Sequence, residues 1–595
     1  MKKYLHYLFL LIIVGLVTLI NFFWLKADFA PPSGDANAHL LLTIDFWDLI
    51  YSNDFWAVKL GKVIFFSTGA YPPLVYWLSF VFYRLFGLST FTAIMGQGLF
   101  ILIFVISIYQ IGKTLWNPTV GLIMALVGAG SPLFIIYSRT FLLDFPLLAL
   151  FTCGYACLIA AKNFQNRRAS LALGVALALG MLTKWALVYF MLLPLAVIAL
   201  PIFWKGFPKL GAKLVLMFSF LAALIVGVFF SVKGFGRLAL LPYFLFMLGL
   251  GFVISQWSKK SEQENQAPDE ESEKAPFLNL LQSFWIFLLI CGGWYLIYSS
   301  QIIERLFYQV NVSGTYVPFL NRLLLNFNTI FLTYPFSLIF FLIGLVISLW
   351  NPQDRKKNWI TLLNLLFSFL LIAITLPFDS RYILPAFPLV LQISLFWITR
   401  NKWLTPFLCG FLILASLLQL NGYWLAERKL IPQPLSPFIK TISLNEEGAT
   451  IAAPHWLKSN ALLIFTSPPD SARYNQEKTM ELILRSSRKK VTGIGIYNNL
   501  DKAPVQGRSL FLTCRLKHYK NIELISMEDE QINYPAQKLQ FILMISNQNS
   551  DFISWQKQAE KRLGEKLKLL QEFPLKDRFI IRIFQRESLA CSKKA

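Results

Sequence analysis

A few charged side chains stand out against a very apolar sequence, and their types suggest group transfer from an anionic substrate. Asp35 and Asp144 are carboxylates that each precede an apolar, helix-like segment. Arg139, Lys184 and Arg381 are basic residues at the ends of other apolar segments. A carboxylate can orient an acceptor or take its proton, and Lys and Arg can stabilise a departing phosphate. Such chemistry requires elements that bring the five side chains to one place.

The composition indicates a polytopic membrane protein. The chain has 595 residues, of which 56% are hydrophobic and only 15% are charged, more apolar surface than a soluble protein of this length could hide. Lys and Arg number 55 against 32 Asp and Glu. We attribute this excess to the bias of basic residues toward cytoplasmic loops and to a basic tail, and we expect no nucleic-acid partner.

The apolar segments predict thirteen transmembrane helices. A span needs roughly 20 apolar residues, and the first segment is interpreted as an uncleaved signal anchor. Residues 73–86 are too short to cross and are expected to form an interfacial or re-entrant helix. The thirteen spans are predicted near 7–25, 90–112, 119–137, 145–161, 169–183, 185–203, 214–231, 238–257, 277–298, 327–350, 359–376, 382–399 and 404–420.

The distribution of basic residues supports this topology. If residues 73–86 do not cross, the basic connections, such as Lys113, Arg167 and Arg355, all face the cytoplasm. The amino terminus is then cytoplasmic and the carboxyl-terminal part extracytoplasmic, in a multi-pass protein of the plasma or inner membrane. If residues 73–86 crossed, those clusters would face outward.

Two domains are expected. Residues 1–420 form the transmembrane domain, with a first outward loop at 26–72 that contains juxtamembrane helices. Residues 258–276 are a polar cytoplasmic linker that we expect to be disordered. Residues 421–595 are predicted to form a soluble extracytoplasmic α/β domain. Its strands are expected at 461–467, 491–497, 509–514, 521–526, 539–546 and 579–585, and its helices at 475–487 and 553–571.

Five segments, taken in order, resemble motifs of the polytopic glycosyltransferases with the GT-C fold. The closest resemblance is to the branch that contains the protein O-mannosyltransferases and the lipid A aminoarabinose transferases. The five segments are Gly34-Asp35, Tyr71-Pro72-Pro73-Leu74-Val75-Tyr76-Trp77, the run 138–147 (SRTFLLDFPL), Leu182-Thr183-Lys184 and Arg381-Tyr382-Ile383-Leu384-Pro385. The sequence departs from the family at Ala36, where Glu is frequent, and at Tyr71, where some members have Lys.

This resemblance implies an α-helical polytopic protein of the GT-C type and an inverting hexosyl- or pentosyltransferase. The donor would be a polyprenyl-phosphate-linked sugar, and the acceptor a protein, lipid or glycan on the outer face of the membrane. Asp35 would be the catalytic carboxylate and Asp144 its partner. The resemblance assigns substrate contacts to Arg139, Lys184, Arg381, Tyr71, Tyr76 and His39.

Structural roles compete with these assignments. Asp35 and Asp144 each fit a helix cap, and Lys184 fits a helix end whose amine reaches the membrane interface. Arg381 could form a surface ion pair with Asp379. Asp35 and Asp144 could also hold Mg or Mn, and the sequence leaves the metal open.

Two other functions remain as alternatives at this point. The first is a transporter or flippase of an anionic lipid or glycan, which would carry charges in mid-span and inverted repeats of broken helices. Neither feature is evident in the sequence. The second is a catalytically inactive scaffold whose outer domain is a binding module.

Overall fold

A computed structural model describes the chain at residues 2–28, 30, 32, 34–66, 71–206, 247, 271–316, 318–331, 337–376, 380–420, 439–442, 463–466, 476–486, 492–498, 512, 513, 515, 522–526, 539–546, 549–574 and 580–586. The spans predicted at 214–231 and 238–257, and linker residues 258–270, lie outside the described residues.

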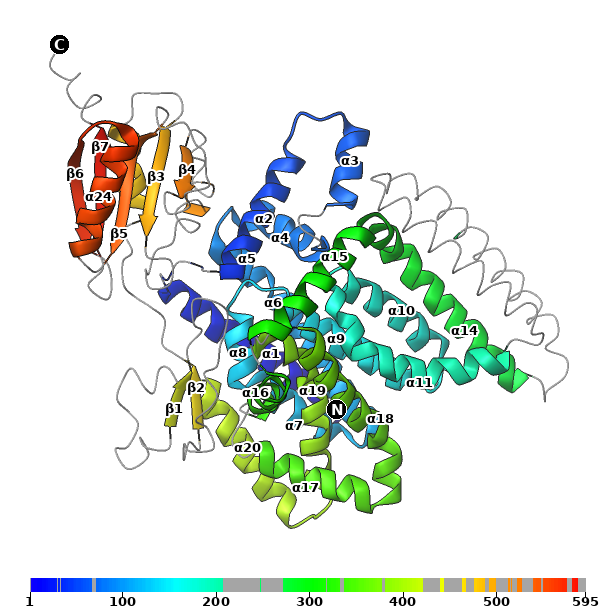
Figure 1. Ribbon diagram of the computed structural model, residues 1–595. Coiled ribbons are helices and arrows are strands. Elements are labelled where there is room, and N and C mark those ends of the chain that lie inside the picture. The colour runs from blue at the N-terminus through cyan, green and yellow to red at the C-terminus, as the bar shows by residue number, and fades with distance from the viewer. Residues whose placement is uncertain are drawn as a thin grey trace.

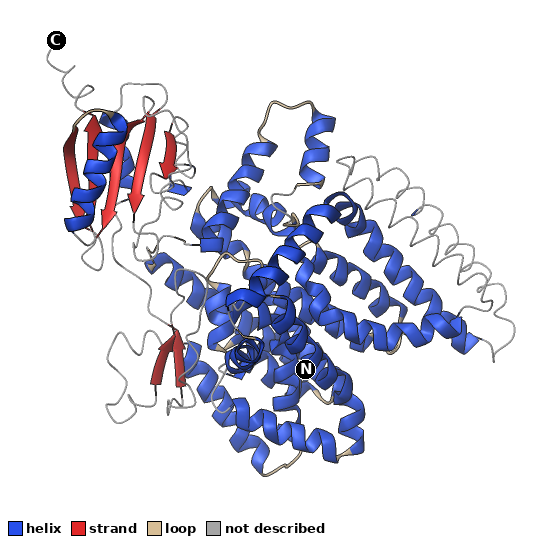
Figure 2. Cartoon of the chain, in the orientation of Figure 1, coloured by secondary structure: helices blue, strands red, loops and turns tan. Residues whose placement is uncertain are grey.

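Up to Leu420 the described chain is helical (Figures 1 and 2). The helices of the first half are α1 (Lys2–Ala27), α2 (Gly34–Ile50), α3 (Trp56–Ile64), α4 (Leu74–Phe86), α5 (Thr90–Gly96), α6 (Gly98–Leu115), α7 (Pro118–Ala129), α8 (Pro132–Ser138), α9 (Asp144–Ala160), α10 (Arg167–Met181), η1 (Trp185–Leu187) and α11 (Val188–Gly206). The second half contains α14 (Glu271–Phe287), η3 (Leu288–Gly292), α15 (Gly293–Tyr316), α16 (Phe319–Phe331), α17 (Ser337–Trp350), α18 (Pro352–Thr375), η4 (Ser380–Ala386), α19 (Phe387–Leu395), η5 (Phe396–Thr399) and α20 (Leu404–Leu420).

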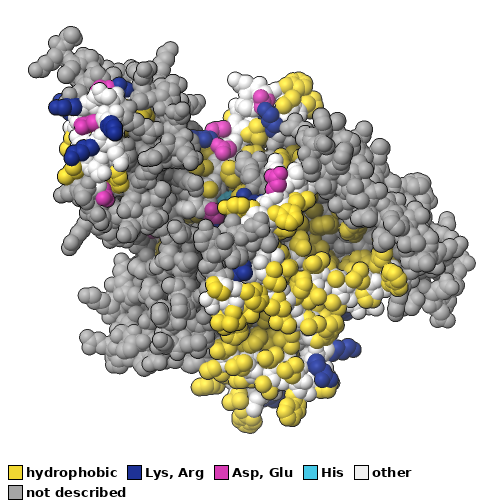
Figure 3. Space-filling model, viewed as in Figure 1, with side chains coloured by type: hydrophobic (Ala, Val, Ile, Leu, Met, Phe, Trp, Pro, Cys, Tyr) yellow, Lys and Arg dark blue, Asp and Glu magenta, His cyan; other side chains and the backbone are white. Residues whose placement is uncertain are grey.

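The described helices confirm a polytopic membrane protein. Six are long and apolar enough to cross a membrane, and the bent pair α7–α8 would make a seventh. Four further apolar helices, α4, α9, α17 and α20, are shorter, at 10–17 residues. Figure 3 shows hydrophobic side chains over the broad lower part of the helical region, as lipid contact requires. The figure of thirteen spans stays a prediction.

One predicted span is bent, and two predicted boundaries are wrong. The predicted span 119–137 is broken by a 59° bend between α7 and α8, where Ser131 accepts a hydrogen bond from the Phe134 amide and Pro132 begins α8. The predicted span 327–350 starts inside α16, a separate helix from α17. The last six residues of the predicted linker, 271–276, are the first residues of α14 and are not disordered.

Helix α4 has the length expected for residues 73–86. It has 13 residues, too few to cross a hydrocarbon core about 30 Å thick. Tyr76 and Tyr83 are buried on one side of the helix, whereas Leu85 and Phe86 at its end are exposed. The Leu74 amide donates to the Leu182 carbonyl at 3.0 Å, which joins two of the motif segments directly.

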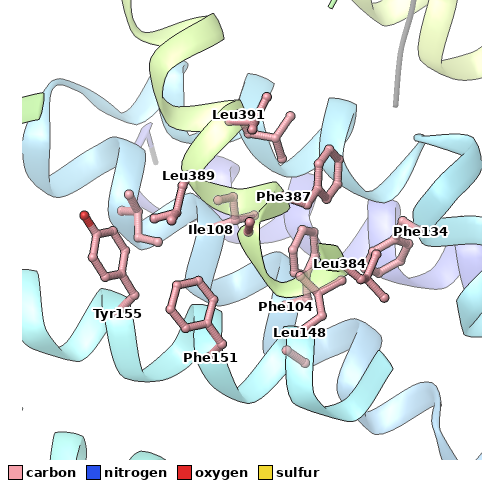
Figure 4. Packing of buried hydrophobic residues seen from close by; sticks show 14 of the residues in the cluster. Phe104, Ile108, Phe134, Leu148, Phe151, Tyr155, Leu384, Phe387, Leu389 and Leu391 are labelled. Atoms are coloured by element: carbon pink, nitrogen blue, oxygen red, sulfur yellow. The ribbon is translucent and has the colours of Figure 1, made fainter. Parts of the chain in front are cut away.

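The helical core is built from aromatic and branched side chains of distant segments. Phe104 of α6 and Phe387 of α19 are stacked with ring centroids 6.4 Å apart, and Phe134 of α8 packs on Phe104 at 4.6 Å. Figure 4 shows these rings together with Phe151 and Tyr155 of α9. Such interdigitation fixes the helices that carry the charged residues.

The carboxyl-terminal part contains a mixed five-stranded sheet with strand order β4-β3-β5-β7-β6. The central strand β5 is parallel to β3 and antiparallel to β7. Its side chains alternate between α22 on one face and α24 on the other, and all eight residues are buried. The elements are β1 (Ile439–Ile442), β2 (Leu463–Thr466), α22 (Gln476–Ser486), β3 (Thr492–Asn498), β4 (Ile522–Ser526), β5 (Leu539–Ser546), α24 (Asn549–Leu563), β6 (Leu567–Pro574) and β7 (Ile580–Arg586).

The predicted α/β character of this part is confirmed, with two local errors. The predicted helix 553–571 ends at Leu563, and β6 begins at Leu567. Gly564 stands between them with φ of +70°, the left-handed geometry in which glycine ends a helix. Within the predicted strand 509–514, the described residues Leu512 and Thr513 are helical.

Candidate active site

Helix α2 presents two of the predicted site residues on one face. Asp35 and His39 are four residues apart, so their side chains lie one above the other. The chain enters the helix at Gly34, whose φ of +52° is readily adopted only by glycine. On another face of α2, Leu40 and Ile44 are buried in a cluster that includes Val75 of α4. The helix is therefore packed through the face that carries Leu40 and Ile44, whereas Asp35 and His39 lie near the charged side chains of Arg381, Lys184 and Asp144.

Asp35 pairs with a residue almost at the other end of the helical region. Its Oδ2 accepts from Arg381 Nη2 at 2.5 Å. The Arg381 side chain is 8% exposed, whereas that of Asp35 is 48% exposed. Asp35 is not the cap of a helix starting at Ala36, because α2 already begins at Gly34. Asp379, the alternative partner of Arg381, lies outside the described residues.

Asp144 and Lys184 form a second ion pair, which is buried. Lys184 Nζ donates to Asp144 Oδ1 at 2.6 Å, with side-chain exposures of 12% and 3%. The cap position of α9 is Leu143, and no side chain caps it, so the Asp144 carboxylate is directed to Lys184. The Tyr382 ring lies 5.0 Å from Lys184 Nζ and 5.2 Å from Arg381 Cζ. This ring joins the two ion pairs through cation–π contacts.

The Pro-Pro segment contributes an aromatic wall to the same site. His39 packs edge-to-face on Tyr71 with centroids 4.7 Å apart, and its Nδ1 is 2.9 Å from the Tyr76 hydroxyl. Arg305 of α15 donates to the Tyr71 hydroxyl at 2.5 Å, and its guanidinium lies 4.5 Å from that ring. The predicted contacts Tyr71, Tyr76 and His39 are thus brought together.

The charges of Lys184 and Arg381 shift the pKa values of Asp35 and His39. Partial burial alone would raise the pKa of Asp35, but the Arg381 charge and hydrogen bond outweigh it and hold the pKa below the usual range. Burial lowers the pKa of His39 to about 3, and the Lys184 and Arg381 charges add to this, so the ring is neutral at pH 7. The site therefore combines an ionised, reachable carboxylate with mostly buried cations.

Two arginines fall outside the predicted arrangement. Arg139 packs against α1, where its Nε donates to Asn21 at 2.8 Å and its guanidinium lies 4.9 Å from the Trp24 ring. The leading influences on the pKa of Asp35 and of His39 come from burial and from other charged residues. Arg305 was not singled out as a substrate contact from the sequence. Its position at the end of a long apolar helix, on the predicted outer side, was the only signal for it.

The carboxylates give little support to a metal site. Asp35 faces Arg381 and Asp144 faces Lys184, so each carboxylate is already matched by a cation. No group of three or more His, Cys, Asp or Glu side chains gathers among the residues that the structure describes. This donor set does not fit Mg or Mn, which prefer several oxygen ligands, and we derive no step through a metal.

The comparisons with known proteins agree with this architecture. Residues 70–233 match the family model described as dolichyl-phosphate-mannose-protein mannosyltransferase. The ArnT structure from Cupriavidus metallidurans bound to undecaprenyl phosphate aligns with a TM-score of 0.50 and 13% identity over 97% of this chain and 98% of that one.

Two further structures align less closely. The oligosaccharyltransferase of Archaeoglobus fulgidus aligns with a TM-score of 0.44 and 12% identity, over 91% of this chain and 70% of that one. The arabinofuranosyltransferase AftD from Mycobacteria gives 0.39 and 11%, over 97% and 40%. A search of the curated proteins gave no match. The resemblance to GT-C glycosyltransferases is confirmed, and the alignment to ArnT shows the fold.

Proposed function

We propose that this chain, with its GT-C fold, is an integral membrane glycosyltransferase that moves a sugar from a polyprenyl-phosphate carrier to an acceptor. The observation that carries this function is the arrangement of the two ion pairs. Asp35 is half exposed and ionised, whereas Arg381 and Lys184 are mostly buried beside it. A nucleophile can reach the carboxylate, and a phosphate can be held by the cations.

In this reaction Asp35 acts on the acceptor. The acceptor hydroxyl or amine donates a hydrogen bond to the carboxylate and attacks the anomeric carbon from the face opposite the phosphate. As the new bond forms, the acceptor proton becomes acidic and passes to Asp35. The bond between the anomeric carbon and the phosphate oxygen breaks, and its electron pair leaves with the lipid phosphate. The sugar configuration is inverted.

The basic residues stabilise the leaving phosphate. Arg305 is oriented by the Tyr71 hydroxyl and ring, and Arg381 and Lys184 are oriented by the Tyr382 ring. Charge-assisted hydrogen bonds from such groups favour the developing phosphate charge. His39 is neutral and therefore adds no positive charge, and with Tyr76 it shapes the wall that faces the sugar. Asp144 holds Lys184 in place. We assign Arg139 to the α1–α8 contact, not to substrate binding.

The topology follows the same proposal. The site faces the outer side of the plasma or inner membrane, the amino terminus is cytoplasmic, and residues 421–595 form an extracytoplasmic domain on the transmembrane domain 1–420. ArnT was crystallised with undecaprenyl phosphate, and this lipid is the first carrier to test. The acceptor is a lipid, glycan or protein.

The test is transfer by the purified full chain in nanodiscs from a panel of undecaprenyl-phosphate sugars to extracted envelope lipids, glycans and proteins. Asp35→Asn should reduce transfer by at least about a hundredfold while undecaprenyl phosphate still binds. Asp54→Asn is the matched control, because Asp54 lies in the same loop and contacts Lys62 at 2.8 Å at the surface. Transfer retained by Asp35→Asn, or no transfer by the wild type from any donor, would refute the proposal.

The transporter alternative is not favoured. The two ion pairs lie where α2, α9 and η4 begin, whereas translocation requires charged groups along a path through the spans.

A further inference from the structure

The carboxyl-terminal part contacts helix α2 and its neighbours through Leu512 and Arg515. Leu512 is 2% exposed. It belongs to a hydrophobic cluster with Leu40 and Ile44 of α2, Val75 and Tyr83 of α4, Ala93 of α5, and Phe141 and Leu143. In Figure 1 the five-stranded sheet lies on the side of the helical region where α2 and α5 are found.

Arg515 adds two ion pairs to this apolar contact. Its Nη2 is 2.9 Å from Asp45 Oδ1 and 2.8 Å from Asp48 Oδ2. Asp45 and Asp48 are three residues apart on α2, so both face the same way. One guanidinium therefore holds two carboxylates on the second half of the helix whose first turn carries Asp35.

Three members of the cluster around Leu512 are neighbours in the chain of residues in the candidate site. Leu40 follows His39, Val75 precedes Tyr76, and Leu143 precedes Asp144 in the chain. Leu512 thus packs behind three segments that each carry a residue of the candidate site. A shift of this contact moves the backbone of those segments, and a displacement of about 1 Å of a reacting group can cost a hundredfold in rate.

We infer that Leu512 and Arg515 are positioning residues, by which the carboxyl-terminal domain holds α2 so that Asp35 meets Arg381. This inference rests on the proposed function for its effect on turnover, but the docking itself does not. Helix α2 has 17 residues, and most of the stability of a helix within a protein comes from its tertiary packing. Docking from outside completes those contacts.

The test uses charge reversal in the full chain. Arg515→Glu removes both ion pairs, Asp45→Lys with Asp48→Lys removes them from the other side, and the combined triple variant restores opposite charges. Arg582→Glu is the matched control: Arg582 lies in the same sheet domain, is similarly exposed (24% against 27%), and pairs with Glu572 in its own domain. Leu512→Ala tests the apolar contact.

Hydrogen–deuterium exchange of residues 34–50 is the first measurement. Each one-sided reversal should speed exchange by about fivefold, the factor expected for two part-exposed ion pairs. The triple variant should return it to within about twofold of the wild type, and Leu512→Ala should act in the same direction as Arg515→Glu. The control should exchange like the wild type. Unchanged exchange in Arg515→Glu, or a triple variant no better than the single one, overturns the inference.

Turnover is the second measurement and separates the two proposals. In Arg515→Glu, kcat should fall by about fivefold or more, with the Kd for undecaprenyl phosphate within about twofold of the wild type. A fall in lipid affinity with kcat unchanged would contradict a positioning role. If the wild type transfers no sugar, the proposed function fails, while the exchange result still decides the docking.

Discussion

Breaking the ion pair of Lys184 and Asp144 tests whether these two residues act as a unit. Removing one partner of a buried pair costs about 3–5 kcal/mol, because the other charge is left in a poor solvent. In Asp144→Asn the Tyr382 ring remains 5.0 Å from Lys184 Nζ, and a cation–π contact offsets about 1 kcal/mol. We therefore expect Asp144→Asn to lower the free energy of unfolding by about 2–4 kcal/mol.

The double variant Asp144→Asn/Lys184→Met provides the decisive comparison. Because neither charge remains, its free energy of unfolding should lie within about 1 kcal/mol of the wild type. Lys184→Met alone leaves Asp144 buried and unpaired and should cost about 3–5 kcal/mol, so the coupling energy should be at least about 4 kcal/mol. The measurement is reversible denaturant unfolding in mixed micelles, read by tryptophan fluorescence. The surface pair Lys62–Asp54, which is 2.8 Å apart and whose side chains are 44% and 34% exposed, should show no measurable coupling. Additive effects of the two buried substitutions would refute the reasoning.

Transfer activity then separates stability from function. If Lys184 contacts the donor phosphate, the stable double variant should still be impaired by about tenfold or more in kcat/KM. A double variant that is both stable and fully active would restrict this pair to a structural role.

Three other predictions follow from single features of the site. The pKa of His39 is 6.5 in the unfolded chain and about 3 in the folded chain. The contribution of His39 to the free energy of unfolding is therefore complete above about pH 6.5 and should fall by about 2 kcal/mol by pH 5, because only the unfolded chain takes up the proton in that range. In His39→Gln, thermal melts followed by circular dichroism should lose this part of the pH dependence. Arg322 is 7% exposed, and its Nε and Nη1 have no hydrogen-bond partner in the described chain. Arg322→Met should therefore raise the free energy of unfolding by about 1–3 kcal/mol. Arg139→Met removes the contact with Asn21 and should lower the melting temperature in the same thermal assay. Because the carboxylates face cations, EDTA should leave transfer unchanged, and recovery of lost activity by added Mg or Mn would contradict the non-metal site.

The order of the predicted motifs along the chain reflects real spatial neighbours in most cases. Asp35, His39, Tyr71, Tyr76, Asp144, Lys184 and Arg381 gather in the structure, although they come from five separate segments. Arg139 is the exception. It directly follows α8, where the loop that leads to Asp144 begins, and its guanidinium is directed to α1. A motif establishes that a residue is near the site but leaves the direction of its side chain open.

The sequence by itself determined the class of the molecule and the approximate positions of its helices. Both depend on local properties: a run of about 20 apolar residues must satisfy its backbone as a helix in lipid, and basic residues favour the cytoplasmic ends of spans. The short block 73–86 was recognised in the same way, and α4 indeed has only 13 residues. The break of the segment 119–137 was missed, because Gly130-Ser131-Pro132 was outweighed by the apolar run around it.

Only the tertiary structure decided which charges meet. Asp35 and Arg381 are 346 residues apart, and Arg305 and Tyr71 are 234 apart, so neither pairing follows from local periodicity. The same is true of Arg515, which lies 470 residues beyond Asp45. These contacts depend on the packing of helices around a shared core, which selects one partner for each charge among many that the sequence allows. The sequence therefore identified which residue types could take part in the chemistry. The fold determined which of them pair, and with it which carboxylate is exposed and which cations are buried.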